Sequence, residues 1–411
     1  MNETRPIVIV GNGPYANRGC EAIAKSSIRI IRDHLPGVSI INGNPFAEYD
    51  QADETEPDVR HEQCVPCRGP YSRMWMSHRL FKATGIARNF SSAGRWVQSR
   101  SHGAAAVLSA GGDLYGLSYG EEQLLQYLFF GLAALGAKTP FVIWGATIGK
   151  MDASPKLKKL AMEHFKRCSL VLVREQDSVD YLASCGVKDN VRLVADPAFV
   201  LEPGKPAFDL RLNDPLGESI GFNLAAAYGA YGGNGSFKDM VALGADCVEE
   251  IVRRTKRPVI LVPHVVGYPP GACPDNDTVF LSLIREVLAQ RGVDVGMASS
   301  SLRSWELKWV LGHLKTYVGS RWHSTVGALG SATPTLSIGF SEKAPALNKF
   351  LLGHDRYVLN CKELNPVGLA DKLEELLTNE EQVRQALRDR LPAVQELARS
   401  AGAHLKELLA G

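Results

Sequence analysis

The stretch from Tyr317 to Lys343 carries side chains that could bind a small anion and protonate it. An arginine and a histidine stand only two residues apart, at Arg321 and His323, and the stretch ends in a lysine. Arginine binds carboxylate and phosphate groups through two parallel hydrogen bonds, and histidine exchanges protons because its ordinary pKa is about 6.5. This combination suits a dianion on which a proton transfer must occur. The structural alternative is that Arg321 pairs with a carboxylate and His323 caps a helix.

The residues around this pair predict how it is held. Residues 316–318 predict a strand, the small residues after His323 predict a short helix, and residues 335–340 predict a second strand. Ligands of open α/β sheets bind beyond the carboxyl ends of parallel strands. We therefore expect Arg321, His323 and Ser324 to lie at such an edge.

Strand–helix alternation continues through most of the chain and predicts parallel sheets. A shift to Pro, Gly and Asp at residues 201–217 marks a linker between two α/β halves. We predict an N-terminal α/β domain of residues 1–203, with an irregular insertion at about 45–103, and a C-terminal α/β domain of residues 204–365. Residues 366–411 predict final helices that pack across the domains.

The first predicted strand leads into Asn17, Arg18 and Gly19 at the N-terminus of a helix. Free amides and the helix dipole at such a place favour an anion. Glu21 in the first turn either stabilises the dipole or acts as a base, and the structural role is the favoured interpretation. A dinucleotide fingerprint beginning at Gly11 is rejected, because a proline interrupts it and no acid follows the next strand.

Further polar residues follow other predicted strands in the N-terminal half. Gly111 and Gly112 come after a buried strand, where glycines let a ligand approach the backbone, and Asp113 follows them. Arg174 stands at the end of the strand 170–173 and offers a second guanidinium. Asp196, before a proline, is interpreted as a turn residue.

The composition limits the class of function. The 411 residues carry 46 Lys and Arg against 44 Asp and Glu, a net charge of +2 that gives no reason to expect nucleic-acid binding. The N-terminus lacks the pattern of a signal peptide, so we expect a cytoplasmic protein with reduced thiols. Cys64 and Cys67 form the single close cysteine pair, and no second pair completes a metal site.

Taken in order, these short motifs resemble the polysaccharide pyruvyl transferase family. The resemblance covers roughly residues 8–350, although Cys20 stands where an acidic residue is common. The motifs are Asn17-x-Gly19-x-Glu21-Ala22, Gly111-Gly112-Asp113, Arg174-Glu175, Asp196-Pro197-Ala198-Phe199, Pro263-His264, the Asp275 and Asp277 loop, and Arg321-x-His323 with Pro334 and Lys343.

The resemblance implies two Rossmann-like domains facing a cleft, as in the GT-B glycosyltransferases. It also implies phosphoenolpyruvate as the donor, and a sugar hydroxyl pair of a polysaccharide, or of its lipid-linked precursor, as the acceptor. The product would be a cyclic pyruvate ketal in exopolysaccharide, cell-wall polymer or surface-glycan biosynthesis. Such a reaction requires no cofactor and no metal.

The same resemblance suggests roles for individual residues. His323 is our choice for the general acid that protonates the donor's methylene carbon. Arg321 and Arg174 would clamp the donor, and Lys343 would bind the leaving phosphate. The substrate-binding set is completed by Asn17, Gly19, Glu21, Gly112, Asp113, His264 and Ser324. The base for the acceptor hydroxyls stays open between Asp113, Glu21 and His264, and a structural histidine is an equal interpretation of His264.

Three other functions compete with pyruvyl transfer. A GT-B glycosyltransferase using a nucleotide sugar is the main alternative; it needs an acid for a ribose, for which Glu342 is the candidate near the opening stretch. A non-catalytic binding protein does not explain a histidine beside an arginine, and a dinucleotide enzyme fails at Gly11. The sequence leaves open the acceptor sugar, its carrier, the ketal regiochemistry and the oligomeric state.

The segment 45–103 is rich in Arg and Trp and has no clear period. We expect amphipathic helical pieces there, either as an insertion or as a mobile lid. A peripheral contact with the inner face of a membrane, made through a lipid-linked acceptor by Trp75, Trp96 and the arginines, is one interpretation. A small buried cluster of these tryptophans is the favoured one.

Overall fold

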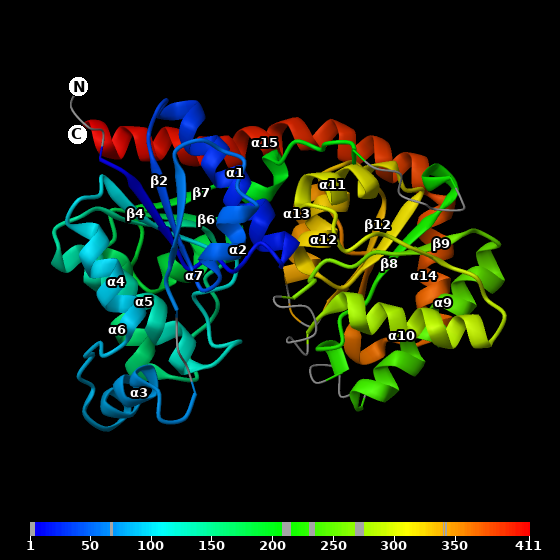
Figure 1. The fold of residues 1–411 in the computed structure, drawn as a ribbon, viewed down its shortest axis with the longest axis horizontal. Helices are drawn as coiled ribbons and strands as arrows, with labels where there is room; N and C mark the ends of the chain where they lie inside the picture. Colours follow the sequence, from blue (N-terminus) through cyan, green and yellow to red (C-terminus); the bar gives the residue numbers. More distant parts are fainter. Residues whose placement is uncertain are drawn as a thin grey trace. The chain divides into compact units, whose positions relative to one another are not determined.

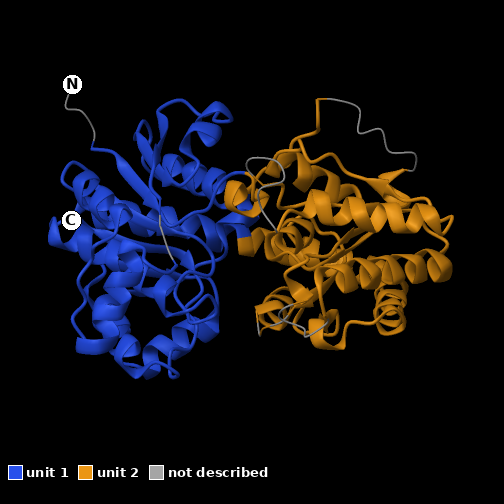
Figure 2. Ribbon diagram, turned by 60° about the horizontal axis from the view of Figure 1, so that its bottom comes forward, with its two compact units in different colours: residues 1–15, 23–200, 395–411 blue, residues 16–22, 201–394 orange. Residues whose placement is uncertain are grey.

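The computed structural model describes residues 5–65, 69–207, 215–229, 235–267, 275–339, 341 and 343–411. The chain forms two compact units, coloured separately in Figure 2. Unit 1 comprises Met1–Tyr15, Ile23–Val200 and Gln395–Gly411, and unit 2 comprises Ala16–Ala22 and Leu201–Val394. Cys67, Glu342 and residues 230–234 lie outside the described residues.

Unit 1 is built on a seven-stranded sheet whose neighbouring strands all pair in parallel. The strand order is β3-β2-β1-β4-β5-β6-β7. A parallel sheet is covered on both faces, which explains why several of these strands are continuous apolar runs. The strands are β1 (Ile7–Val10), β2 (Ile40–Asn44), β3 (Val59–Gln63), β4 (Ala106–Ala110), β5 (Phe141–Ala146), β6 (Leu170–Val173) and β7 (Val191–Leu193).

Helices cover both faces of this sheet (Figure 1). From β5, Phe141 and Ile143 join the core formed with the helices that follow β4 and β5. On the opposite face, the indole Nε1 of Trp144 donates to Ser27 Oγ of the first helix at 3.0 Å. The helices are α1 (Arg18–His34), α2 (Ala47–Ala52), α3 (Arg73–Thr84), α4 (Ser92–Ser101), α5 (Glu121–Gly136), α6 (Pro155–Arg167) and α7 (Gln176–Ser184).

Unit 2 contains a six-stranded parallel sheet of order β10-β9-β8-β11-β12-β13. Its strands are β8 (Ile220–Asn223), β9 (Val259–Leu261), β10 (Gly296–Met297), β11 (Thr316–Gly319), β12 (Thr335–Gly339) and β13 (Val358–Asn360). Its helices are α9 (Phe237–Thr255), α10 (Asp277–Gln290), α11 (Ser304–His313), α12 (Trp322–Leu329), α13 (Lys343–Leu352), α14 (Pro366–Thr378) and the first part of α15 (Glu380–Ala410).

Each sheet has one place where the chain changes the side on which it adds strands. In unit 1 this switch lies between β1 and β4, and in unit 2 it lies between β8 and β11. Open parallel sheets bind ligands beyond the strands' carboxyl ends at such a switch point. Gly111 follows β4, and Arg321 and His323 follow β11, so the predicted site residues begin at these two places.

The predicted α/β fold with two parallel sheets is confirmed. The description of residues 45–103 as irregular was wrong in one respect, because β3 forms the edge of the first sheet there. Its sequence, Val-Arg-His-Glu-Gln, is charged and half exposed, so it lacks the apolar run of a central strand. The predicted domain boundary follows residue 203, and in the structure the chain passes from unit 1 to unit 2 between Val200 and Leu201. Residues 16–22 and α14 also belong to unit 2.

Candidate active site in unit 2

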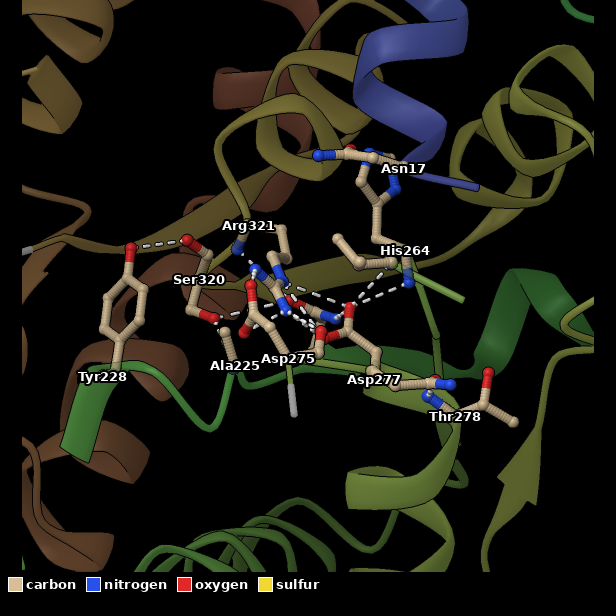
Figure 3. Close-up of polar contacts among 12 residues, drawn as sticks. Asn17, Ala225, Tyr228, His264, Asp275, Asp277, Thr278, Ser320 and Arg321 are labelled. Carbon is tan, nitrogen blue, oxygen red and sulfur yellow. Dashed lines mark hydrogen bonds and ion pairs between the residues drawn. The ribbon is translucent and has the colours of Figure 1, made fainter. Parts of the chain in front are cut away.

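Arg321 lies at the centre of a network of carboxylates beyond β11 (Figure 3). Its Nη1 and Nη2 donate to the two carboxylate oxygens of Asp275 at 2.7 and 2.8 Å. Its Nε and Nη2 donate to Asp277 Oδ1 at 3.0 and 2.7 Å. Burial alone would lower the pKa of Arg321, but these two negative charges raise it. The structural interpretation, that Arg321 pairs with carboxylates, therefore describes this structure.

Asp277 organises the ends of three strands at once. It is buried in the first turn of α10, and its Oδ2 accepts from the backbone amides of His264 and Val265 at 2.9 and 3.0 Å. The side-chain amide of Asn223, at the end of β8, also donates to it at 3.1 Å. Asn276, not Asp277, is the helix N-cap. From the sequence, Asp277 was named only as part of a loop motif, and its contact with Arg321 was not predicted.

His264 is a buried imidazole that follows β9. Its side chain is 5% exposed, and neither ring nitrogen has a hydrogen-bond partner among the described residues. Burial is the largest cause that lowers its pKa well below the ordinary value, and the nearby charges of His323, Arg321 and Arg18 act in the same direction. The ring extends toward Asn17 in Figure 3, and the backbone of Asn17 bridges Val265. A buried polar group without a protein partner is typical of a ligand-binding or water-binding position.

His323 stands in the first turn of α12, and its ring packs against the backbone of Gly19. A Cβ at position 19 would lie 2.6 Å from the His323 Nδ1 and 2.7 Å from its Cβ. Because real Cβ atoms do not approach so closely, only glycine fits opposite this imidazole. The structure therefore brings together two of the residues predicted from distant motifs, and it gives Gly19 the role of a spacer.

The N-terminus of α1 is less open to an anion than the sequence suggested. The amide of Arg18 donates to the carbonyl of His264 at 3.0 Å, and the amide of Gly19 donates to Asn17 Oδ1 at 3.0 Å. Asn17 thus caps the helix with its own side chain. The expectation of free amides was wrong here, since those of the first two helical residues already have acceptors.

Glu21 makes the contacts of a structural residue. Its side chain is fully buried, and Oε2 accepts from the amide of Ser304 at the start of α11 at 2.8 Å. Arg18 donates to the same oxygen at 3.2 Å and to the carbonyl of Ser300 at 3.1 Å. The structural role favoured from the sequence agrees with these contacts.

Two other predicted residues, Ser324 and Lys343, differ in their exposure. Ser324 is fully buried, and its hydroxyl donates to the carbonyl of Arg321 at 2.7 Å, so its contacts shape the turn after β11. Ser320 in the same turn accepts from the amide of Ala225, and its carbonyl accepts from Tyr228 at 2.6 Å. Lys343 begins α13 and is partly exposed.

The predicted residues of unit 1 form a separate cluster beyond β4 and β6. Arg174 is buried, and its guanidinium donates to Asp196 and, at 3.0 Å, to Thr147 Oγ1. A Cβ at Gly112 would lie 2.3 Å from the Arg174 Nη1, so this glycine makes room for the guanidinium. Asp196, interpreted as a turn residue, is also the ion-pair partner of Arg174. Burial alone would lower the pKa of Arg174, but the charges of Asp196, Glu175 and Asp113 raise it.

Two kinds of feature are absent from the part of the chain that the structure describes. No group of three or more His, Cys, Asp and Glu side chains there is arranged to hold a metal ion. None of the helices described is both long and apolar enough to span a membrane.

A family model described as polysaccharide pyruvyl transferase matches residues 17–342. The chain belongs to this family. The resemblance seen in the sequence motifs is thereby confirmed, and membership makes the protein a transferase with a polysaccharide acceptor. The matched range includes both the Arg321 network of unit 2 and the Arg174 cluster of unit 1. No curated protein sequence matches the chain.

Solved structures similar to this pyruvyl transferase family member share its fold at low sequence identity. A ugt transferase from Siraitia grosvenorii in complex with UDP matches with a TM-score of 0.58 and 9% identity, over 99% of this chain and 100% of that one. A UDP-N-acetylglucosamine 2-epimerase matches with a TM-score of 0.57 and 10% identity, over 98% and 95%. The calicheamicin glycosyltransferase CalG4 matches with a TM-score of 0.54 and 13% identity, over 100% and 99%. The predicted GT-B-like fold is confirmed.

Proposed function

We propose that the protein transfers the pyruvate unit of phosphoenolpyruvate to a hydroxyl pair of a polysaccharide or its precursor, forming a pyruvate ketal. The observation that carries this proposal is the convergence of Arg321, His323 and His264 at the switch point of unit 2, inside the matched family region. A guanidinium and two imidazoles are suited to binding an anion and moving protons on it.

Arg321 is the proposed anchor for the donor's carboxylate. The Asp275 carboxylate receives Nη1 and Nη2 side by side, which is the geometry with which arginine binds a free carboxylate. The Asp275 side chain is 41% exposed, whereas that of Asp277 is 1% exposed. In our proposal the donor carboxylate replaces Asp275 on the fork, while Asp277 keeps the guanidinium in place. Without this exchange the two aspartates would repel a dianionic donor.

His323 is the proposed general acid. It protonates the methylene carbon of the donor, which becomes the methyl group of the product, and the adjacent carbon gains the character of an oxocarbenium ion. One acceptor hydroxyl adds to that carbon and loses its proton to a base. The second hydroxyl displaces the phosphate group, which leaves with the remaining proton.

His264 is our choice for a neutral partner in this reaction. Its lowered pKa keeps the imidazole uncharged at neutral pH, so one ring nitrogen can donate and the other can accept. We favour His264 over Glu21 as the base, because the Glu21 carboxylate already accepts from the Ser304 amide and from Arg18. Asp113 and Arg174 of unit 1, and Lys343, keep their proposed substrate-binding roles.

The decisive experiment is calorimetric titration of the purified protein with phosphoenolpyruvate and, separately, with UDP and UDP-sugars. We expect saturable binding of phosphoenolpyruvate that weakens in Arg321→Lys, because an ammonium cannot reproduce the planar fork. Binding of the nucleotides alone would contradict the proposal and favour a glycosyltransferase. Circular dichroism of the variant separates loss of binding from loss of the fold.

A further inference from the structure

One long stretch of unit 1 contains basic residues and no acidic ones. From Gln63 to Gly112 the sequence contains neither Asp nor Glu, although the whole chain has 44 of them and a net charge of only +2. Such segregation produces a local positive field that the near-neutral total conceals. The basic residues of this stretch are Arg68, Arg73, Arg79, Lys82, Arg88, Arg95 and Arg100.

Helix α3, at the edge of unit 1 (Figure 1), and the turn after it carry Arg73, Arg79, Lys82 and Arg88. Arg95 and Arg100 lie on α4, where Arg100 pairs with Glu62 at 2.6 Å. One side of α3 is fixed to the unit, since Met74, Ser77 and Phe81 are buried and the helix packs on α5. On the outward side, Arg73 and Arg79 are exposed. Helix α3 is therefore anchored to the unit by one side, and its other side bears cations.

Large apolar side chains of α3 and its flanking turns are also exposed. Tyr71 is 88% exposed, Ile86 is 58% exposed and Met76 is 51% exposed. Tyr71 also adopts a left-handed backbone with φ of 66°, which is rare and unfavourable for a bulky residue. Its ring lies 5.7 Å from that of Trp75, and the Arg79 guanidinium lies 5.5 Å from the Trp75 ring.

Three exposed arginines of this segment are not neutralised by the part of the chain that the structure describes. Arg73, Arg79 and Arg88 have no carboxylate partner among the described residues. The carboxylate that does contact α3 is Glu121 of α5, which lies 3.0 Å from His78 and 3.4 Å from Lys82. The surface thus presents uncompensated positive charge together with apolar side chains.

We propose that this surface, formed by Tyr71, Arg73, Met76, Arg79, Ile86 and Arg88, docks on an anionic lipid bilayer. Basic residues are attracted to anionic headgroups, and aromatic or aliphatic side chains enter the headgroup boundary. A soluble polyanion would satisfy the arginines but would leave Tyr71, Met76 and Ile86 in water. The bilayer accounts for both kinds of side chain, and docking there would bring the enzyme to acceptors carried on lipid.

Vesicle co-sedimentation of the full-length protein tests this proposal. Vesicles of phosphatidylcholine mixed with phosphatidylglycerol are compared with vesicles of phosphatidylcholine alone, at low and at high salt. We expect binding to the anionic vesicles that decreases with salt. Each basic residue near the surface contributes about fivefold, so Arg73→Gln, Arg79→Gln and Arg88→Gln together should reduce the partition by about a hundredfold.

A matched triple variant removes the same charge elsewhere. Arg285, Arg388 and Lys406 are exposed and form no ion pair with the described residues, so their replacement by Gln should leave vesicle binding unchanged. A second test variant, Tyr71→Ser with Met76→Gln and Ile86→Ser, keeps the charge and should weaken binding at least tenfold. Circular dichroism and thermal unfolding establish that each variant is folded.

Three outcomes would overturn the proposal. The first is equal binding of the wild-type protein to both kinds of vesicle, and the second is equal loss in the two arginine triples. The third is binding of wild-type protein to a soluble anionic polysaccharide with no binding to vesicles. Because this surface shares no residue with the donor site, vesicle binding and phosphoenolpyruvate titration can fail independently.

Discussion

The imidazole of His323 occupies the space that a side chain at position 19 would fill. The distance of 2.6 Å from a Cβ at that position to Nδ1, and 2.7 Å to both Cβ and Cγ, involves the root of the ring and not a flexible tip. The amide of Gly19 donates to the side chain of Asn17, and the amide of Arg18 donates to the carbonyl of His264. The first turn of α1 is thereby fixed as one wall of the site.

Gly19→Ala should lower the transfer rate at least tenfold by displacing His323. Helix propensity alone would predict a more stable protein, since alanine in place of glycine stabilises a helix by about 1 kcal/mol. Gly136→Ala in α5 is the matched control, because a Cβ there meets nothing within 4 Å. The measurement is the rate of phosphate release with acceptor, together with the midpoint of thermal unfolding. A Gly19→Ala enzyme as active as the control would show that the ring position is not critical.

His323→Ala should abolish transfer while leaving donor binding measurable. The general acid acts in the transition state, so its loss lowers the rate far more than it lowers affinity for the ground state. Rates are followed by phosphate release, and donor affinity by calorimetry. Transfer at a near wild-type rate would exclude His323 as the acid.

Asp275→Asn and Asp277→Asn should have opposite effects on donor affinity. The exposed Asp275 competes for the Arg321 fork in our proposal, so Asp275→Asn should tighten phosphoenolpyruvate binding several-fold and cost about 1 kcal/mol of stability or less. Asp277 is buried and accepts from Arg321 and two backbone amides, so its replacement should cost about 3 kcal/mol or more and weaken binding. Calorimetry and chemical denaturation provide the two measurements. Weaker binding by Asp275→Asn would argue against the exchange of carboxylates.

The free energy of unfolding should fall as the pH decreases from about 6.5 toward 5. Burial lowers the pKa of His164 to about 3 and that of His264 well below its ordinary value. The unfolded chain therefore binds protons that the folded chain does not, and each such histidine contributes a slope of up to about 1.4 kcal/mol per pH unit. Glu54, whose pKa is lowered to about 2, loses its contribution only below this window.

Chemical denaturation of His164→Leu across the same pH range tests this assignment. Removing one of the two histidines with a lowered pKa should reduce the slope by about half, and the exposed His102→Leu variant serves as the control. An unchanged slope in His164→Leu would mean that other groups carry the pH dependence.

The fold and the centre of the site could be predicted because both depend on local patterns. Apolar runs marked the strands, and the short motifs after them marked Arg321 and His323. The strand β13 and the helix α13 were not predicted, since β13 has only three residues and α13 has a proline in its first turn. A proline is tolerated there because its missing N–H would have no helical acceptor.

The partners of the site residues could not be predicted because they come from distant parts of the chain. Asp275 and Asp277 precede Arg321 by more than 40 positions, and no pattern in the sequence pairs them. Glu21 gave the signal of a first-turn acid, but its partner Ser304 lies in the other half of the sequence. The order of the strands, which places β11 beside β8, also follows from long-range packing and not from local periodicity.

Unit 1 contains both the first and the last residues of the chain. Its segment Gln395–Gly411 carries the buried residues Ala398, Ala401 and Leu405, and Gly402 packs against His34 and the carbonyl of Ile30. During synthesis, therefore, the N-terminal sheet emerges early, but α1 lacks its contacts at Ile30 and His34 until residues 395–411 have been made. Unit 1 thus combines segments from distant parts of the sequence, and a chain cut at residue 394 would lack the contact of Gly402 with α1.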